Sequence, residues 1–436
     1  MEENKSKKNS NQKPPSTDPP ISKKVIDINE IKKATSSVLY EFAKKYEIEK
    51  PNLLTKDELI YKILKEKSEI HEIILATGVL EILPDGFGFL RTSNYLPSSD
   101  DIYISQTQIR RFALMSGDKV SGEIRAPKEN ERYFSLLKIT EVNKKEADLI
   151  KQRTRFSHLT PIYPDEQLKL EIGSTPISGR LIDMLSPIGK GQRSLIVSPP
   201  KAGKTTILKE IANSIAKNHP EAIIKVLLID ERPEEVTDME RSVHGEVIYS
   251  TFDEPPEQHV RISELVLESA KRLVESNHDV VILLDSITRL ARAYNLVVPP
   301  SGRTLSGGLD PSSLHKPKRF FGGARNIESG GSLTIVATAL VDTGSRMDDI
   351  IYEEFKGTGN MELHLERKLA NRRIYPAIDI INSGTRKEDL LIPEDILKKS
   401  YLLRKNIDSD SATEELIKLL EQSKSNDDFL NSAIFR

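Results

Sequence analysis

The stretch Leu195-Ile-Val-Ser-Pro-Pro-Lys-Ala-Gly-Lys-Thr-Thr206 decides the fold of this chain. It opens with three aliphatic residues, and a helix-forming segment follows its glycine, lysine and threonines. A strand, a glycine-containing loop and a helix in this order are the context of a phosphate-binding P-loop, in which backbone N–H groups cradle phosphate oxygens. We therefore expect a bound nucleotide to contact Pro200, Lys201, Ala202, Gly203, Lys204, Thr205 and Thr206.

Two side chains of this loop suit a triphosphate and its metal. Lys204 can reach the β- and γ-phosphate oxygens, and the Thr205 hydroxyl can bind Mg²⁺. The loop departs from the usual pattern at Ser198, where the first glycine normally stands. A polar turn at a helix start would also account for Gly203-Lys204-Thr205, but the flanking strand and helix favour ATP or GTP binding.

Strand-like and helix-like segments alternate on both sides of the loop, through residues 177–436. The strand-like segments are nearly continuous apolar runs, as expected for strands buried on both faces. They are residues 195–197, 223–229, 247–249, 280–284 and 333–337. This alternation predicts an α/β domain with a parallel sheet covered by helices.

Carboxylates follow two of these runs. Asp285 ends residues 280–284, at the edge where the P-loop should lie, so it can hold Mg²⁺ through water. A turn residue or helix cap is the alternative for an isolated Asp at a strand end. Glu231 follows residues 223–229 and can polarise the water that attacks the γ-phosphate. Its alternative role is to cap the helix that follows.

The chain before the motor divides by composition. Residues 1–27 have little apolar surface and are predicted to be a disordered tail. Residues 28–72 carry apolar side chains at helical spacing, with a capping box at Thr55–Glu58, and predict a helical subdomain. Short strand-like runs with turn residues predict a small β-barrel over residues 73–143. A connector, residues 144–176, leads into the motor.

The barrel segment contains Asp85-Gly-Phe-Gly-Phe-Leu-Arg91. Phe87 and Phe89 are two residues apart and share one face of a strand, where they can stack on bases. Arg91, Arg110 and Arg111 can meet phosphates. Two Phe on one face are usually core, but the intervening glycine and nearby arginines favour nucleic-acid binding.

Residues 303–325 form the clearest basic stretch, because Arg303, Lys316, Lys318, Arg319 and Arg325 accompany a single acid, Asp310. Glycines should make it mobile. A solvated surface loop is the ordinary interpretation of such a run, whereas inside an ATPase core it would suit a pore that tracks phosphates.

Composition excludes several classes of protein. The 436 residues contain no Cys, 30% charged residues and a net charge of −2, so disulfides, thiolate metal sites and a generally basic coat are excluded. Scattered histidines make zinc unlikely to bind. No apolar run approaches the roughly 18 residues of a membrane helix, and no signal segment is evident. We therefore expect a cytoplasmic protein without a membrane partner.

Several long motifs resemble the Rho termination factor family, from about residue 50 onward. They are Leu228-Ile-Asp-Glu-Arg-Pro-Glu-Glu-Val-Thr237, Asp285-Ser-Ile-Thr-Arg-Leu-Ala-Arg-Ala-Tyr-Asn295, Glu354-Phe-Lys-Gly-Thr-Gly-Asn-Met-Glu-Leu363, Asp85 to Arg91 and Glu131-Arg-Tyr133. The resemblance implies a homohexamer with ATP sites between subunits, a cold-shock-like OB-fold barrel as primary RNA site, and a RecA-like motor. The expected activity is an RNA-dependent ATPase and 5′-to-3′ helicase that releases the nascent transcript from the RNA polymerase elongation complex.

The resemblance also implies roles for individual residues. Tyr375 would pack on adenine, Arg386 would be the arginine finger given to a neighbour, Arg373 would lie at a related interface, and Arg232 would join Glu231 and Lys204 in the catalytic set. The implied primary RNA site is Phe87, Phe89, Arg91, Tyr103, Arg110, Glu131 and Tyr133. The implied pore loops are residues 301–309, with Arg303, Ser306 and Gly307, and residues 342–346, where Arg346 stands in place of the usual Lys.

Two other classes share part of this pattern. A rotary ATP synthase catalytic subunit has the same motor fold, but the Phe-bearing barrel and the basic loops oppose it. A non-enzymatic RNA-binding protein with a degenerate P-loop is opposed by the intact Lys204, Thr205, Glu231 and Asp285.

Overall fold

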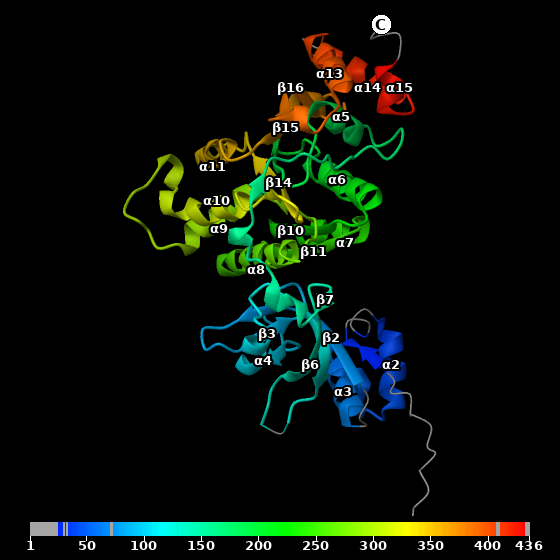
Figure 1. Ribbon diagram of the computed structural model, residues 1–436, viewed down its shortest axis with the longest axis vertical. Coiled ribbons are helices and arrows are strands. Elements are labelled where there is room, and N and C mark those ends of the chain that lie inside the picture. The colour runs from blue at the N-terminus through cyan, green and yellow to red at the C-terminus, as the bar shows by residue number, and fades with distance from the viewer. Residues whose placement is uncertain are drawn as a thin grey trace, which may run out of the picture.

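The computed structural model describes residues 25–28, 31, 34–69, 73–128, 130–406 and 410–431. Two bodies follow one another along its long axis (Figure 1). The N-terminal helices and a small barrel form one, and a larger α/β body forms the other, with the C-terminal helices at its far end. Within the described ranges, no helix is long and apolar enough to cross a membrane.

The N-terminal helices are α2 (Ser36–Lys45), η1 (Pro51–Leu53) and α3 (Lys56–Glu69). The predicted capping box is confirmed, since Thr55 N–H donates to Glu58 Oε2 at 2.8 Å and Glu58 N–H donates to Thr55 Oγ1 at 3.4 Å. Leu39 and Ile63 are buried in a cluster that also contains barrel residues. The helices and the barrel therefore share one core.

The predicted tail is wrong at its end, because Val25–Asp27 form strand β1. This strand pairs in parallel with the start of β2 (Ile73–Ile82), with Val25 opposite Ile73. On that side of β2, β3 pairs only with Val79–Ile82, so the first half of the edge is open to another strand. Residues 1–24, the rest of the predicted tail, lie outside the described residues.

Five strands close the barrel in the order β2-β3-β4-β6-β5, with β5 pairing back to β2. Neighbours are antiparallel except β4 and β6, which run parallel. The other elements are β3 (Gly88–Arg91), β4 (Ile102–Ile104), α4 (Gln106–Arg111), β5 (Lys119–Arg125) and β6 (Phe134–Val142). This closed five-stranded Greek-key barrel is an OB-fold, as predicted.

The larger body is built on a sheet ordered β11-β10-β12-β14-β9-β15-β16. All neighbours are parallel except β15 and β16. The strands are β9 (Arg193–Ser198), β10 (Ile223–Glu231), β11 (Glu246–Thr251), β12 (Val280–Asp285), β14 (Ser332–Leu340), β15 (Met361–Leu365) and β16 (Ile378–Thr385). Each predicted apolar run lies within one of these strands, which confirms the predicted parallel sheet.

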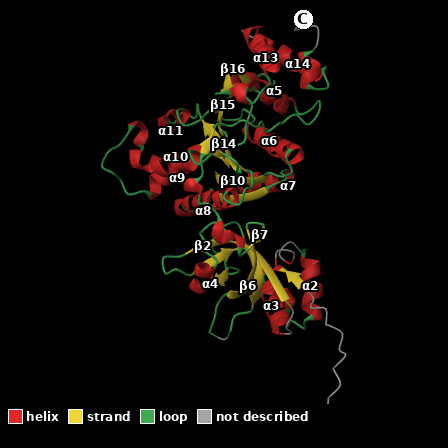
Figure 2. Ribbon diagram, in the orientation of Figure 1, coloured by secondary structure: helices red, strands yellow, loops and turns green. Residues whose placement is uncertain are grey.

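Helices cover both faces of this sheet (Figure 2). One face packs on α5 (Ile177–Leu185), α6 (Lys204–Asn218), α7 (Pro233–Ser242), α12 (Arg367–Asn371), α13 (Glu394–Asn406), α14 (Asp410–Glu421) and α15 (Asn426–Leu430). The other face packs on α8 (Pro256–Val274), α9 (Ile287–Val297), α10 (His315–Phe321) and α11 (Arg346–Lys356). Short 3₁₀ turns are η2 (Leu149–Gln152), η3 (Phe156–His158), η4 (Ser306–Gly308), η5 (Pro311–Leu314) and η6 (Glu388–Leu390).

The segment predicted as a connector joins both sheets. Strand β7 (Lys145–Glu146) pairs with β6 of the barrel, and β8 (Pro161–Ile162) pairs with β13 (Arg325–Ile327) of the motor. Residues 144–176 therefore extend each body by a strand instead of running free between them.

Polar contacts join the barrel to the motor. The Lys225 ammonium on β10 is buried between Tyr95 Oη at 2.6 Å and Glu246 Oε2 at 2.5 Å. The Asn94 side chain pairs with both backbone groups of Tyr249, at 2.7 and 2.8 Å. This loop between β3 and β4 thus covers the exposed edge of β11, which would otherwise offer unpaired backbone groups.

Candidate functional site

The P-loop lies between β9 and α6, where a central strand of the sheet meets a helix N-terminus. Gly203 has φ +90° and Lys201 has φ +65°, so the loop turns its backbone toward the space that a phosphate would fill. Ser198 is the last residue of β9 and its hydroxyl donates to Pro199 O at 2.9 Å. A strand residue needs no glycine, which explains why serine is tolerated there.

The structure brings Lys204, Asp285 and Glu231 together at the carboxyl edge of the sheet. Lys204 Nζ lies 2.7 Å from Asp285 Oδ1 and 3.7 Å from Glu231 Oε2. Burial opposes the charge on Lys204, but the two carboxylates outweigh it and raise the pKa of the ammonium. The Thr338 hydroxyl on β14 donates to Asp285 Oδ1 at 2.7 Å and fixes that carboxylate. Lys204 is therefore charged and held at the phosphate edge.

Glu231 is buried at the end of β10, after a bulge in which Asp230 has φ +57°. Within the described part of the chain, its Oε2 atom has no hydrogen-bond partner. Burial raises the pKa of this carboxyl, which is a property of a general base. Arg232, not Glu231, is the N-cap residue of α7, and no side-chain cap bond forms there. The alternative role of Glu231 as a helix cap is therefore not supported.

The donor set at the phosphate edge fits Mg²⁺ in a nucleotide complex. Thr205 offers a hydroxyl at the start of α6 and Asp285 a carboxylate at the end of β12. Among the described residues, no three His, Asp or Glu side chains gather as a metal cage. Mg²⁺ bound to a triphosphate needs only one or two protein ligands, because phosphates and water supply the others.

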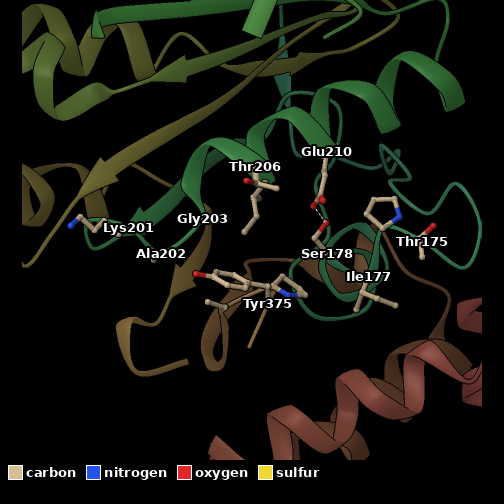
Figure 3. A pocket seen from close by; sticks show the side chains of 13 residues that line it. Thr175, Ile177, Ser178, Lys201, Ala202, Gly203, Thr206, Glu210 and Tyr375 are labelled. Atoms are coloured by element: carbon tan, nitrogen blue, oxygen red, sulfur yellow. Dashed lines mark hydrogen bonds between the residues drawn. The ribbon is translucent and has the colours of Figure 1, made fainter. Parts of the chain in front are cut away.

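A cavity of about 690 Å³ opens beside the P-loop (Figure 3). The side chain of Tyr375 lies on one wall and is 46% exposed, and a Cβ on Gly203 would lie 3.7 Å from its ring. An aromatic ring in this position can stack on a nucleotide base. The lining residues are Thr175, Pro176, Ile177, Ser178, Lys201, Ala202, Gly203, Thr206, Ile207, Glu210, Tyr375, Pro376 and Ala377.

The remaining residues of the predicted catalytic set, Arg232, Arg373 and Arg386, are exposed. Arg386 follows β16, whose Thr385 pairs with Met361, which in turn pairs with Ser194 at the start of β9. Roughly 13 Å of strand separates Ser194 from Ser198, at about 3.3 Å per residue. Arg386 thus lies near the amino end of β9, whereas the P-loop of its own chain follows the carboxyl end of that strand.

Four aromatic rings from three parts of the barrel form one half-exposed platform. Phe89 packs edge-to-face on Phe87 at 5.9 Å and on Tyr133 at 4.9 Å, and Tyr103 lies 5.7 Å from Phe87. A second cavity of about 540 Å³ adjoins the platform and is lined in part by Tyr103, Tyr133 and Glu131. Rings that share one open face can stack on successive bases.

Arg91 does not lie where a phosphate contact requires it. Its side chain is buried and paired with Asp101, and its Nη2 atom lies 2.7 Å from Glu81 Oε2. Glu81 lies on the neighbouring strand β2 and Asp101 directly precedes β4, and the guanidinium lies 5.3 Å from the Phe89 ring. The predicted phosphate contact of Arg91 is therefore wrong. Its guanidinium is paired with two acids and packs against the Phe89 ring, so it supports the aromatic platform.

The other charged residues of the predicted RNA site are at the surface. Glu131 accepts from Arg125 at 2.5 and 2.8 Å, and this hydrogen bonding lowers the pKa of Glu131 to about 2. Arg110 and Arg111 end helix α4 and are exposed. The Glu131 carboxylate thus remains ionised at neutral pH. Arg110 and Arg111 are exposed and can contact phosphates.

The two predicted pore loops contact each other. A Cβ on Gly307 would lie 2.7 Å from the backbone nitrogen of Met347 and 3.0 Å from the carbonyl carbon of Arg346. Gly307 also has φ +74°, so a side chain there would be strained. Arg303 and Arg346 are exposed. Ser306 lies with Gly307 in the turn η4.

The basic stretch 303–325 is not a single patch. Lys316 pairs with Glu264 of α8 at 2.7 Å, and Lys318 pairs with Glu354 of α11 at 2.5 Å. The Arg325 guanidinium lies over the Phe156 ring at 4.7 Å. The predicted single basic patch is therefore wrong, because the fold brings acids from distant helices against Lys316 and Lys318.

Sequence reasoning missed three residues on α9. Arg289 lies 3.6 Å from Asp230 and 3.7 Å from Glu231, while Arg292 Nε donates to Asp348 at 2.7 Å. Asn295 Nδ2 donates to Gly308 O at 3.1 Å. Their spacing of three residues was a visible signal, because residues three apart share a helix face.

Family models match three segments of the chain. The Rho termination factor N-terminal domain matches residues 30–72, the Rho termination factor RNA-binding domain matches 76–148, and the ATP synthase alpha/beta family nucleotide-binding domain matches 179–385. The chain is 60% identical over 410 residues to transcription termination factor Rho of Bacillus subtilis (strain 168), which covers 94% of this chain and 96% of the relative. The chain belongs to the Rho transcription termination factor family.

Other Rho proteins are similar over the same span. Identity to Rho of Thermotoga maritima is 56% over 412 residues, covering 93% of this chain and 96% of the relative. The barrel and the N-terminal segment both match models of Rho domains. The alternative of a rotary ATP synthase subunit is therefore not supported.

Solved structures confirm the motor fold. A prototypical ATPase of the type III secretion system of pathogenic bacteria superposes with a TM-score of 0.53 at 23% identity, covering 62% of this Rho-family chain and 85% of the other. The assembled ATPase EscN of enteropathogenic E. coli superposes with a TM-score of 0.51 at 20% identity, covering 70% and 76%. At these identities the likeness concerns the fold alone.

Proposed function

We propose that this chain is an RNA-dependent ATPase that moves along single-stranded RNA and terminates transcription. The observation that carries the proposal is the Lys204 ammonium between Asp285 and Glu231, in a chain that also presents an aromatic RNA platform. Lys204 would hold the β- and γ-phosphates, and Glu231 would accept the proton of the attacking water. Thr205 and Asp285 would hold Mg²⁺, which when bound neutralises charge on the transferred phosphoryl group.

ATP is the proposed nucleotide, because Tyr375 provides a ring beside the P-loop for a purine base. Pro200, Lys201, Ala202, Gly203 and Thr206 would complete the contacts.

The place of Arg386 supports catalysis between subunits. Arg386 lies near the amino end of β9 and is therefore separated from its own P-loop at the other end of that strand. Its side chain is exposed, so it can enter the ATP site of a neighbouring subunit. An arginine that reaches the γ-phosphate stabilises the charge that develops in transfer. We therefore propose that the ATP sites lie between subunits of a homohexamer, the assembly that the family resemblance implies, with Arg373 at a related interface position. Arg232 is proposed to act with Glu231 and Lys204 in the catalytic set.

RNA would bind in two places. The platform of Phe87, Phe89, Tyr103 and Tyr133, with Arg110 and Glu131 beside it, would hold single-stranded RNA as the primary site. The loops that carry Arg303, Ser306, Gly307 and Arg346 would contact RNA in the ring's pore.

The cellular setting follows from this role. The substrate would be the nascent transcript, released from the RNA polymerase elongation complex in the cytoplasm. The proposed division is a helical subdomain at 28–72, an OB-fold domain at 73–143, a connector at 144–176 and a RecA-like motor at 177–436.

The test is ATPase turnover of the full-length protein with single-stranded RNA, with duplex DNA and without nucleic acid. We expect stimulation by RNA alone. Lys204→Ala should abolish hydrolysis and leave primary-site RNA binding intact, because the platform lies on the other body. Lys209→Ala is the matched control, since Lys209 lies on the same helix but pairs with Asp238. Turnover equal with and without RNA would refute the translocase, and residual hydrolysis in Lys204→Ala would refute the site.

A further inference from the structure

One acidic side chain lies among the residues that line the base cavity. Glu210 on α6 accepts a hydrogen bond from the hydroxyl of Ser178 on α5, and both side chains line the cavity (Figure 3). None of the other lining residues carries a carboxylate. Neither residue belongs to the P-loop, and neither is needed for the phosphate chemistry described above.

The position of Glu210 matches a base and not a phosphate. Glu210 follows Lys204 by six residues on α6, which places it roughly 9 Å further along the helix axis at 1.5 Å per residue. Thr206, Ile207 and Glu210 lie on the side of α6 that lines the cavity, with Tyr375 on the other wall. A base stacked on the Tyr375 ring would present its edge to the side chains of that helix face.

The pair offers acceptors to a ligand. A serine hydroxyl has a single proton, and Ser178 gives it to Glu210, so Ser178 Oγ can only accept a further hydrogen bond. An ionised carboxylate has no donor at all. Among the described residues, Ser178 is the one hydrogen-bond partner of Glu210, so the other carboxylate oxygen is free for a donor on the base. Adenine has such a donor in its 6-amino group, whereas guanine carries a carbonyl oxygen at that position.

We propose that Glu210, oriented by Ser178, selects adenine nucleotides by accepting a hydrogen bond from the 6-amino group. This inference rests on the proposed nucleotide site and adds its base specificity. A guanine carbonyl in the same place would face the lone pairs of the carboxylate, leaving acceptors unpaired on both sides. Sites built to hydrogen-bond a substrate group discriminate strongly against analogues that lack it.

The experiment compares three triphosphates on the full-length protein with saturating single-stranded RNA. They are ATP, purine riboside triphosphate, which lacks only the 6-amino group, and GTP. The readout is kcat/KM, with nucleotide affinity from competition against a fluorescent ATP analogue as a second measurement. For the wild type we expect a preference of about 10–100-fold for ATP over purine riboside triphosphate, the effect of one charge-assisted hydrogen bond.

Two variants assign that preference to Glu210. Glu210→Ala should bring the ratio of ATP to purine riboside triphosphate close to one. Glu210→Gln keeps an acceptor for Ser178 and adds a donor, so it should narrow the preference for ATP over GTP by about tenfold or more. Lys209→Ala, one residue earlier on the same helix, should leave both ratios unchanged.

Failure of this inference is distinct from failure of the nucleotide site. Glu210→Ala and Glu210→Gln variants that hydrolyse ATP with wild-type ratios would overturn the inference and leave the site intact. A wild-type protein that hydrolyses none of the three triphosphates would overturn the proposed function itself. If Glu210→Ala does not fold, as judged by its thermal unfolding, the Glu210→Gln ratios decide alone.

Discussion

Replacing Arg91 with Ala should destabilise strands β3 and β4 far more than an arginine truncation elsewhere on the barrel. The side chains of Arg91 and Asp101 are 4% and 2% exposed, so the truncation leaves a buried carboxylate without its cation. Removing one partner of a buried ion pair costs about 3–5 kcal/mol. Asp101 keeps hydrogen bonds from Ser98, which favours the lower value, about 3 kcal/mol.

The assay is hydrogen–deuterium exchange of the full-length protein. At about 1.4 kcal/mol per factor of ten, 3 kcal/mol corresponds to roughly 10²-fold faster exchange of β3 and β4 amides. Arg125→Ala is the control, because Arg125 and Glu131 form an exposed pair on the same barrel, with side chains 27% and 37% exposed. Such a pair contributes about 0–1 kcal/mol, so exchange should change by less than about tenfold.

The outcome also decides between two roles for Arg91. If the guanidinium contacts RNA directly, Arg91→Ala should lower RNA affinity while leaving exchange at the level of the Arg125→Ala variant. That pattern would refute the interpretation of Arg91 as a buried support. Faster exchange together with lower affinity is expected, since Phe89 packs over the guanidinium.

Three further outcomes are expected. Phe89→Ala should weaken single-stranded RNA binding by about 1–3 kcal/mol in fluorescence anisotropy, without a matching loss of thermal stability. Burial raises the pKa of Asp183 to about 7, so the folded protein holds this proton more tightly than the unfolded chain does. The contribution of Asp183 to the free energy of unfolding is therefore fully present below about pH 4 and is lost as the pH rises through about 7. In denaturant titrations Asp183→Asn should remove this one contribution to the pH dependence of stability. Inactive Arg386→Ala and Lys204→Ala subunits mixed in one ring should recover some hydrolysis, and doping with Arg386→Ala that lowers activity only in proportion, without rescue, would contradict a finger acting in trans.

The sequence was sufficient for features set by local pattern. The apolar run 280–284 predicted a strand buried on both faces, because such strands read as nearly continuous hydrophobic runs. Asp285 follows that run directly in sequence, so its place at the carboxyl end of the strand was also predictable. The loop 198–205 predicted the strand-to-helix turn, because its chemistry lies within eight consecutive residues. The capping box at Thr55 was predictable for the same reason.

Features set by long-range pairing were not predictable. Arg91 looks like a surface cation until β2 and β4 bring Glu81 and Asp101 against it, each ten residues away in sequence. Glu210 looks like an ordinary acid on an amphipathic helix, and its partner Ser178 is 32 residues earlier. No spacing rule links residues that meet only after the sheet and its covering helices have formed.

Helix α9 connects the two kinds of site that the sequence identified separately. Arg289 lies 3.6 Å from Asp230 and 3.7 Å from Glu231. Arg292 donates to Ser345 Oγ in the second predicted pore loop at 3.0 Å, and Asn295 donates to Gly308 O in the first at 3.1 Å. These three residues span roughly 9 Å along the helix axis, at 1.5 Å per residue. Because a helix this short moves as a rigid unit, a shift of Arg289 relative to the nucleotide displaces both loop anchors together. Helix α9 therefore links the proposed catalytic carboxylate Glu231 directly to both proposed pore loops.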